Sequence, residues 1–230
     1  MSFKLQYIDH IHQDDNAFSQ YGTLAHKLLE EWAKGDLEDF ELAAEYENRY
    51  DGAVTRYFPP FPKGYAGKVF GQGLAYFESF SGFGEGQEIL SAEEKFELDI
   101  GGYLFVGIAD LVLRDVNTGE ITVIDHKTKS GSSMKKSLNT FRKQLYIYAA
   151  YVKEKYGVFP SLLRFNMLKE GTFIDEVFDE SAYNETMQWV VDTIERIRNE
   201  TEWNAKPNDY FCNYICGVYN QCQEETENNG

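Results

Sequence analysis

The sequence predicts a single α/β domain in which a central mixed β-sheet is flanked by helices on both faces. The chain has 230 residues, which is the usual length of one domain. Of these residues, 43% are hydrophobic and 16% are aromatic, a composition rich enough for a globular core. The hydrophobic patterns follow the order helices, three strands, helix, hairpin and helix, which is typical of a sheet packed between helical layers.

The first half of the chain is predicted to be mostly helical. Its strongest pattern is AFSQYGTLAHKLLEEWAK, in which Leu24, Leu28, Leu29 and Trp32 lie on one apolar stripe. The stretch that follows, which contains prolines and many aromatic residues, is interpreted as a helical insertion. The expected ranges are 17–34, 37–46 and 69–80 for helices, 58–64 for a loop, and about 36–87 for the insertion.

The second half is predicted to hold five strands and two long helices. Turn signals at Gly101-Gly102 and Gly119 separate the first three strands, and Ser181 is the expected N-cap of the last helix. The expected ranges are 89–98, 103–114, 120–125, 162–169 and 172–178 for strands, and 138–156 and 181–199 for helices. A cysteine-bearing segment at 205–222 ends the domain, which spans 1–222, and an acidic, disordered tail is expected over 223–230.

Charge and hydropathy restrict the classes of protein that fit. The net charge of −16 argues against a protein that coats nucleic acid non-specifically. No run of 18 or more apolar residues predicts a membrane span, and the start MSFKLQYIDHIHQ lacks the layout of a secretion signal, so we expect a cytoplasmic protein. Residues 127–153 nevertheless contain seven basic residues and no acidic one. On charge pattern alone, a solvated loop and helix face is an equal alternative. The tract begins at Lys127, beside a carboxylate cluster, and this position favours a polyanionic substrate held against metal ions.

The stretch GIADLVLRDVNTGEITVIDHKTK places two carboxylates inside apolar strands. If Asp115 to Glu120 form the turn, Asp110 lies opposite Asp125, with Cβ atoms about 5 Å apart. Lys127 then shares their face, and His126 points to the other side. This register is favoured because it groups the apolar residues Leu104, Val106, Ile108, Ile121 and Val123 on one face.

Two carboxylates that face each other beside a core are destabilising unless a cation lies between them. Carboxylate oxygens are the ligands that Mg²⁺ and Mn²⁺ prefer, so the pair predicts a site for one of these ions. The alternative is that both aspartates lie at strand ends in water and pair with Lys127 or Arg114.

Four motifs in series resemble the PD-(D/E)XK nucleases, in particular the branch of the RecB and AddB nuclease domains and the CRISPR-associated single-strand exonucleases. Gly22-Thr-Leu-Ala-His26 resembles the G-x-x-x-H of that branch, and Gly107-Ile-Ala-Asp110 resembles its G-x-x-D. Asp125-His-Lys127 resembles the D-x-K, and Gln144-Leu-Tyr-Ile-Tyr148 resembles the Q-x-x-x-Y. Each motif is weak alone, but the series over residues 22–148 is fairly specific. The resemblance implies a restriction-endonuclease-like core.

The resemblance also implies roles for these residues. His26, Asp110, Asp125 and the backbone carbonyl of His126 would bind Mg²⁺ or Mn²⁺, whose bound water attacks phosphorus. Lys127 would position that water and offset charge on the phosphoryl oxygens, while Gln144 and Tyr148 would orient Lys127 or a phosphate. The implied activity is a metal-dependent DNA nuclease, an exonuclease on single-stranded ends in recombination, repair or phage DNA processing, which works beside a helicase or recombination protein.

Further residues are candidates for contact with DNA. The basic candidates are Lys129, Lys135, Lys136, Arg142 and Lys143. The aromatic residues of the insertion either stack on bases or simply pack its core; they are Tyr46, Tyr50, Tyr57, Phe58, Phe61, Tyr65 and Phe70. A catalytically silent DNA-binding or assembly module on the same fold is the main alternative function, and a metal-dependent phosphoesterase that acts on nucleotides is a third.

Cys212, Cys216 and Cys222 are clustered near the end of the chain. In a cytoplasmic protein such clustering favours metal or thiol chemistry over disulfides. Relatives with a [4Fe–4S] cluster carry a similar trio and a fourth cysteine ahead of the histidine helix, but no cysteine precedes His26 here. A [4Fe–4S] cluster, a zinc site of the Cys₃His type and three reduced thiols therefore remain open.

Overall fold

The computed structural model describes residues 1–60 and 62–228 of the protein. Its centre is a five-stranded sheet in the order β1-β2-β3-β4-β5. The β3 and β4 strands are parallel, and the other three pairs are antiparallel, so the sheet is mixed as predicted. The strands are β1 (Gln87–Ile100), β2 (Tyr103–Asp115), β3 (Ile121–Lys127), β4 (Leu162–Met167) and β5 (Thr172–Val177).

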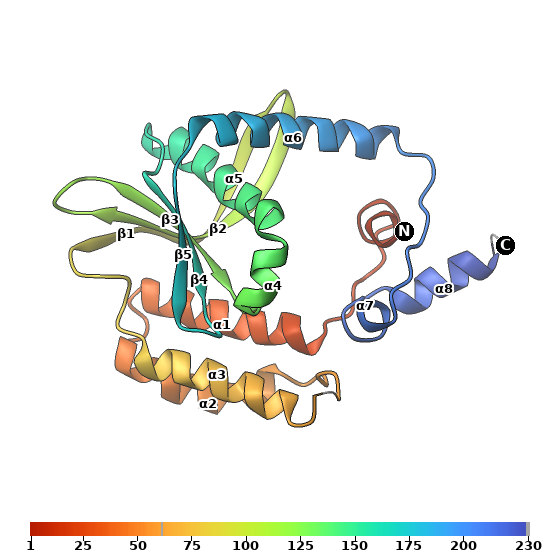
Figure 1. Ribbon diagram of the computed structural model, residues 1–230, viewed down its shortest axis with the longest axis horizontal. Coiled ribbons are helices and arrows are strands. Elements are labelled where there is room, and N and C mark those ends of the chain that lie inside the picture. The colour runs from red at the N-terminus through yellow and green to blue at the C-terminus, as the bar shows by residue number, and fades with distance from the viewer. Residues whose placement is uncertain (61, 229–230) are drawn as a thin grey trace.

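Helices cover both faces of this sheet (Figure 1). Over one face lie α5 and α6, which pack on it through the largest core cluster of the protein. On the other side lies α1, and α2 and α3 cover α1 in turn through a second core. The helices are α1 (Ala17–Ala33), α2 (Leu42–Ala53), α3 (Tyr65–Ser79), α4 (Gly131–Lys136), α5 (Leu138–Tyr156), α6 (Glu180–Asn199), α7 (Asp209–Tyr214) and α8 (Tyr219–Asn228), with a short π-helix at Lys4–Ile8 and a 3₁₀ turn at Asp39–Glu41.

The hairpin of β2 and β3 has the predicted register. Leu111 pairs with Ile124, and Arg114 pairs with Ile121, so Asp110 is placed level with Asp125. The register was predicted from five apolar residues that it places on one face. This argument was partly wrong, because three of the five residues are exposed. Leu104, Val106 and Ile108 are 71%, 48% and 50% exposed, since they lie on the part of β2 that extends with β1 beyond β3.

Several helix boundaries differ from the sequence-based expectations. The helix expected at 37–46 is a 3₁₀ turn followed by α2, and the helix expected at 69–80 begins four residues earlier. Asp179, rather than Ser181, is the N-cap of α6, because its carboxylate accepts a hydrogen bond from the Ala182 N–H at 2.7 Å. The tail expected to be disordered from residue 223 is helical through Asn228 as part of α8, and residues 229 and 230 lie outside the described residues.

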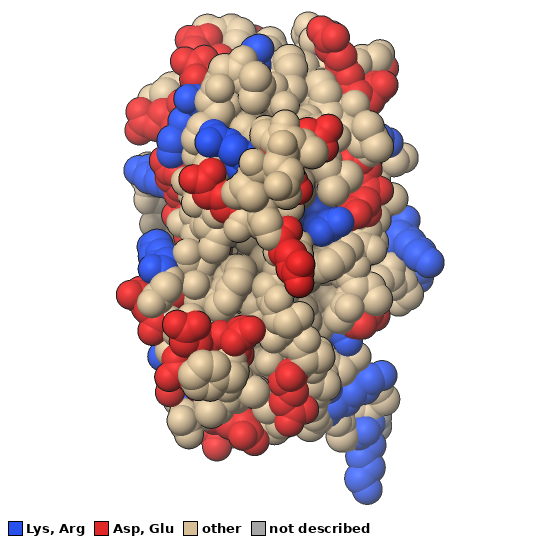
Figure 2. Space-filling model, turned by 90° about the vertical axis from the view of Figure 1, so that its left-hand side faces the viewer, with Lys and Arg blue, Asp and Glu red and all other residues tan. Residues whose placement is uncertain are grey.

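One face of the molecule carries charges of both signs. Figure 2 shows one face of the molecule, on which acidic side chains are scattered and the basic ones are separated by acidic and uncharged residues. In the part of the chain that the structure describes, no helix is both long enough and apolar enough to span a membrane.

Candidate active site

Two buried aspartates meet between the central strands. Asp110 on β2 is 7% exposed, and Asp125 on β3 is fully buried. The backbone N–H of His126 donates a hydrogen bond of 2.8 Å to Asp110 Oδ2, which ties the two strands together at this point. The structure therefore brings the two carboxylates to one site, as the paired register predicts, and does not leave them at strand ends in water.

Burial makes this pair electrostatically costly. Burial raises the pKa of Asp110, and the charge of His26 offsets only part of that effect. Burial and the neighbouring Asp110 together raise the pKa of Asp125 to about 7, even though Lys127 lies 2.6 Å away. The Lys127 ammonium contacts Asp125 Oδ2, and neither oxygen of Asp125 accepts a hydrogen bond of regular geometry among the described residues. A buried carboxylate with one ion pair and no such hydrogen bond keeps lone pairs that a bound cation can use.

His26 reaches this site from α1. Asn16 caps that helix, and its side chain accepts hydrogen bonds from the backbone N–H groups of Phe18 and Ser19. His26 Nε2 lies 3.1 Å from the carbonyl oxygen of His126, and Nδ1 lies 3.7 Å from Asp110 Oδ2. The imidazole and the carbonyl thus lie beside Asp110, and all four predicted metal donors line one cavity. Among the described residues, Asp125 is not in the group of donors that lie within 4.8 Å of one another.

Glu93 is a member of the site that the sequence analysis missed. Its Oε1 lies 2.9 Å from His26 Nδ1, and Glu93, His26 and Asp110 form a group of side-chain donors that all lie within 4.8 Å of one another. Glu93 has a φ of 47°, which is strained for a residue with a side chain. The two-residue turn Gly101-Gly102 could have revealed it, because continuing that register places residue 93 level with Asp110.

The Glu93 contact fixes the orientation of the histidine ring. Burial lowers the pKa of His26, but the hydrogen bond to Glu93 and the charge of Asp110 outweigh it, and the net pKa is raised. Both ring nitrogens face acceptors, Nδ1 the Glu93 carboxylate and Nε2 the His126 carbonyl, which favours the protonated ring in the absence of a metal. When Nε2 gives up its proton, Glu93 still accepts the proton on Nδ1, and Nε2 can act as a ligand. A carboxylate behind a histidine in this manner is the usual support of a metal-binding imidazole.

Lys127 is held by a chain of polar contacts from α5. Its ammonium donates a hydrogen bond of 2.9 Å to Gln144 Oε1, and Gln144 Nε2 donates one of 2.7 Å to the Tyr148 hydroxyl. Tyr148 in turn donates a hydrogen bond of 3.1 Å to Asp110 Oδ1. Gln144 and Tyr148 are one turn apart on α5, so a single helix face connects Lys127 to Asp110.

These groups open into a cavity of about 620 Å³. Phe18 of α1 and Tyr65 of α3 form an aromatic wall, with ring centres 6.1 Å apart. Lys129 and Lys169 also line the cavity, and burial lowers the pKa of both, with the charge of Lys127 adding to the effect on Lys129. The cavity therefore combines a carboxylate cluster, several ammonium groups and aromatic rings.

The other basic candidates for DNA contact lie elsewhere. Lys135 and Lys136 are exposed on α4, and Lys143 lies over the ring of Trp189. Arg142 is not available for a phosphate in this structure, because it forms an ion pair with Glu176 of β5. Of the five predicted basic residues, Lys129 is the one that lines the catalytic cavity.

The aromatic residues of the insertion divide into two groups. Tyr46 and Tyr50 are buried in the core of α1, α2 and α3, together with the partly buried Phe58 and Phe70, so packing accounts for them. Tyr57 is 95% exposed, and Tyr65 lines the catalytic cavity. Phe61 lies outside the described residues.

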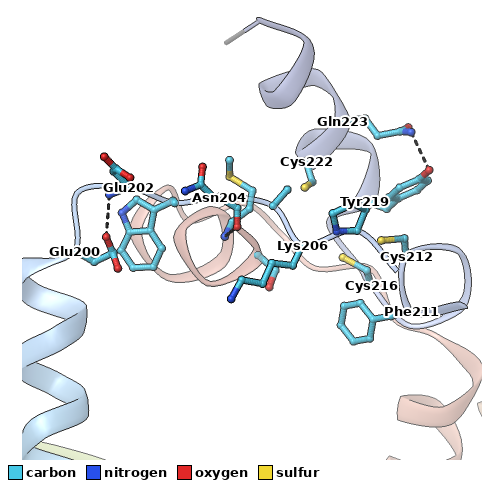
Figure 3. A pocket seen from close by; sticks show the side chains of 15 residues that line it. Glu200, Glu202, Asn204, Lys206, Phe211, Cys212, Cys216, Tyr219, Cys222 and Gln223 are labelled. Carbon is cyan, nitrogen blue, oxygen red and sulfur yellow. Dashed lines mark hydrogen bonds between the residues drawn. The ribbon is translucent and has the colours of Figure 1, made fainter. Parts of the chain in front are cut away.

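The cysteine trio lines a separate cavity of about 890 Å³ near the C-terminus. Figure 3 shows the sulfur atoms of Cys212, Cys216 and Cys222 turned toward a common space. All three side chains are partly exposed. The N-terminal segment reaches this cavity with Met1 and Ser2 rather than a thiol, and no histidine lines it among the described residues. The residues present therefore do not complete the four ligands of a [4Fe–4S] cluster or of a Cys₃His zinc site.

The cysteine-bearing segment also touches the catalytic cavity. Tyr210 of α7 and Ile215, the residue that follows this helix, line the cavity beside His26. Asn16 donates a hydrogen bond of 3.1 Å to the carbonyl of Ile215, so the residue that caps α1 also anchors this segment. The sequence analysis did not connect the segment with the active site, because no local pattern shows this contact.

Comparisons with known proteins identify the family of the chain. The family model of the PD-(D/E)XK nuclease superfamily matches residues 1–223. The chain therefore belongs to the PD-(D/E)XK nuclease superfamily, and the restriction-endonuclease-like α/β fold is confirmed. Among solved structures, that of SSO0001 is similar, with 17% sequence identity, coverage of 97% of this chain and 94% of the other, and a TM-score of 0.36. The comparison with curated proteins found no match.

Proposed function

We propose that this protein is a divalent-metal-dependent deoxyribonuclease that hydrolyses phosphodiester bonds. The observation that carries the proposal is that the buried carboxylates of Asp110 and Asp125 line one cavity with His26 and with the His126 carbonyl that it contacts. Carboxylate, carbonyl and imidazole donors of this kind suit Mg²⁺ or Mn²⁺. When bound, such an ion supplies a water of lowered pKa and positive charge for the phosphoryl oxygens.

The remaining residues have positioning and electrostatic roles in this proposal. Lys127 holds an ammonium next to the cation site, where it offsets negative charge that develops on the scissile phosphate. Gln144 accepts a hydrogen bond from that ammonium and so holds it in place. The Tyr148 hydroxyl accepts a hydrogen bond from Gln144 and donates one to Asp110, which fixes the positions of both side chains. Because these groups are already in place, little reorganisation is needed when the substrate binds.

Single-stranded DNA ends are the proposed substrate. Aromatic rings next to ammonium groups, as in the wall of Tyr65 and Lys169, are how proteins bind single strands without sequence preference. Exonuclease action, and a role beside a helicase or recombination protein in recombination, repair or phage DNA processing, belong to the same proposal.

End-labelled single-stranded and double-stranded DNA incubated with Mg²⁺ or Mn²⁺ tests the proposal. We expect Asp110→Ala and Lys127→Ala to fold normally and to cleave at least about 100-fold more slowly, as when one preorganised electrostatic group is removed. Lys153→Ala is the matched control, because Lys153 contacts the Gly157 carbonyl and the Phe159 ring at the far end of α5 and does not line the cavity. The proposal is wrong if both active-site variants cleave at the wild-type rate. Binding of DNA by the wild type without metal-dependent cleavage would instead support the silent module.

A further inference from the structure

A second cavity adjoins the catalytic cavity and shares Gln144 with it. Its volume is about 280 Å³, near the lower end of pockets that hold small organic ligands. Tyr148, which donates a hydrogen bond to Asp110, also lines this second cavity. Gln144 and Tyr148 therefore form a common boundary between the carboxylate site and the space next to it.

The walls of the second cavity are apolar and largely aromatic. Phe96 and Phe105 stack with ring centres 6.5 Å apart and planes 18° apart. Trp189 of α6 and Ile108 of β2 are 36% and 50% exposed, so both present apolar surface to an incoming ligand. Gly107 makes this arrangement possible, because a Cβ atom at that position would lie 2.5 Å from the Phe96 ring.

The charge of the second cavity differs from that of the protein as a whole. The chain contains 38 acidic and 22 basic residues, yet none of the described residues that line this cavity is acidic. Its one cation is Lys143, whose Nζ lies 3.9 Å from the centre of the Trp189 ring. An apolar cavity with an ammonium at its edge and no carboxylate suits a ligand that joins a flat ring to a phosphate.

We propose that the second cavity is a subsite for one nucleobase of the DNA strand whose phosphate lies at the carboxylate site. This inference rests on the proposed nuclease function and adds a specific binding site to it. The base stacks against Trp189 between the apolar walls, and Lys143 exchanges its contact with the indole ring for one with the adjoining phosphate. Gln144, which borders both cavities, separates the base from the reacting phosphate.

The subsite accounts for the strandedness of the substrate. A base inside a duplex is stacked and paired, and it can enter such a cavity only after it has been unpaired at a cost of a few kcal/mol. A single strand does not carry this cost, so the subsite selects unpaired DNA or a frayed end. The contact is with the face of the base, which every base has, so no sequence preference is expected.

Binding of a fluorescently labelled single-stranded oligonucleotide in EDTA tests the subsite apart from catalysis. We expect Trp189→Ala to weaken binding about 5- to 150-fold, because the variant loses the stacking of one base. In cleavage assays with Mn²⁺, the same variant should raise KM more than it lowers kcat. Trp189→Phe keeps a flat ring and should restore most of the affinity. Phe40→Ala is the matched control, since Phe40 is an exposed aromatic residue that lines neither cavity.

The outcomes separate this inference from the proposed function. If Trp189→Ala binds as tightly as the wild type while Asp110→Ala loses cleavage, the subsite is wrong and the nuclease proposal stands. If Tyr57→Ala weakens binding and Trp189→Ala does not, the bases stack on the insertion instead, and the subsite is again wrong. A wild-type protein that neither binds nor cleaves DNA would overturn both. Thermal unfolding of Trp189→Ala and the recovery in Trp189→Phe show whether a loss of affinity reflects folding.

Discussion

Replacing Asp125 with asparagine should stabilise the metal-free protein at neutral pH while it abolishes cleavage. Asp125 is fully buried, and its pKa is raised to about 7 by burial and by Asp110. A carboxyl whose pKa is higher in the folded state binds its proton more tightly there. The stability that Asp125 contributes is therefore fully present below the ordinary aspartate pKa of about 4, and it is lost as the pH rises toward 7.

The size of this effect follows from the difference between the two pKa values. About three pH units at about 1.4 kcal/mol each give a ceiling of about 4 kcal/mol above pH 7. The raised pKa of Asp125 already includes the attraction of Lys127, so the ion pair at 2.6 Å needs no separate subtraction. The asparagine amide must find acceptors for its own N–H groups, which reduces the expected gain to about 1–3 kcal/mol at pH 8.

Urea unfolding in EDTA at pH 4 and pH 8 measures this prediction. We expect Asp125→Asn to be more stable than the wild type at pH 8 and to lose that advantage at pH 4. Mn²⁺ should stabilise the wild type and not the variant. Asp175→Asn is the control, because Asp175 forms a partly exposed pair with Arg164 and should change stability by less than about 1 kcal/mol. An Asp125→Asn protein less stable than the wild type at pH 8 without metal would refute the reasoning.

Two further predictions concern β1 and β2. Glu93→Gly should weaken Mn²⁺ binding about 10- to 100-fold in calorimetric titration, because His26 loses its support. The same variant should unfold no earlier than the wild type, since glycine relieves the strain of a positive φ, whereas unchanged Mn²⁺ affinity would exclude the support role. Gly107→Val should lower the free energy of unfolding in urea by about 1–3 kcal/mol, because the Cβ of the valine would clash with the Phe96 ring. An unchanged free energy of unfolding would show that the ring moves aside freely.

Local patterns predicted those parts of the fold in which adjacent strands and turns decide the outcome. The turn after Asp115 fixed the register that brings Asp110 and Asp125 level, and the spacing of Gln144 and Tyr148 placed both on one helix face. The Gly101-Gly102 turn between β1 and β2 locates Glu93 opposite Asp110 in the same way, but the sequence analysis did not include this register. Helix α5 was predicted with correct bounds, since Gly157 ends it in a left-handed conformation.

Sequence patterns could not predict contacts between segments that lie far apart in the chain. The ion pair of Arg142 with Glu176 depends on where β5 lies, and nothing near residue 142 indicates it. The exposure of Leu104 and Val106 depends on how far β2 extends beyond β3, which the apolar pattern alone does not show. Tyr210 lines the catalytic cavity only because the C-terminal segment folds back to α1.

The shared use of Asn16 has a consequence for the synthesis of the protein. This side chain caps the helix that bears His26 and also bonds to the carbonyl of Ile215, so the first catalytic element and a late segment of the chain meet at one residue. The carboxylates, the lysine and the histidine are all synthesised before Ile215. A nascent chain therefore carries every proposed metal donor before it holds the late residues that form one wall of the cavity.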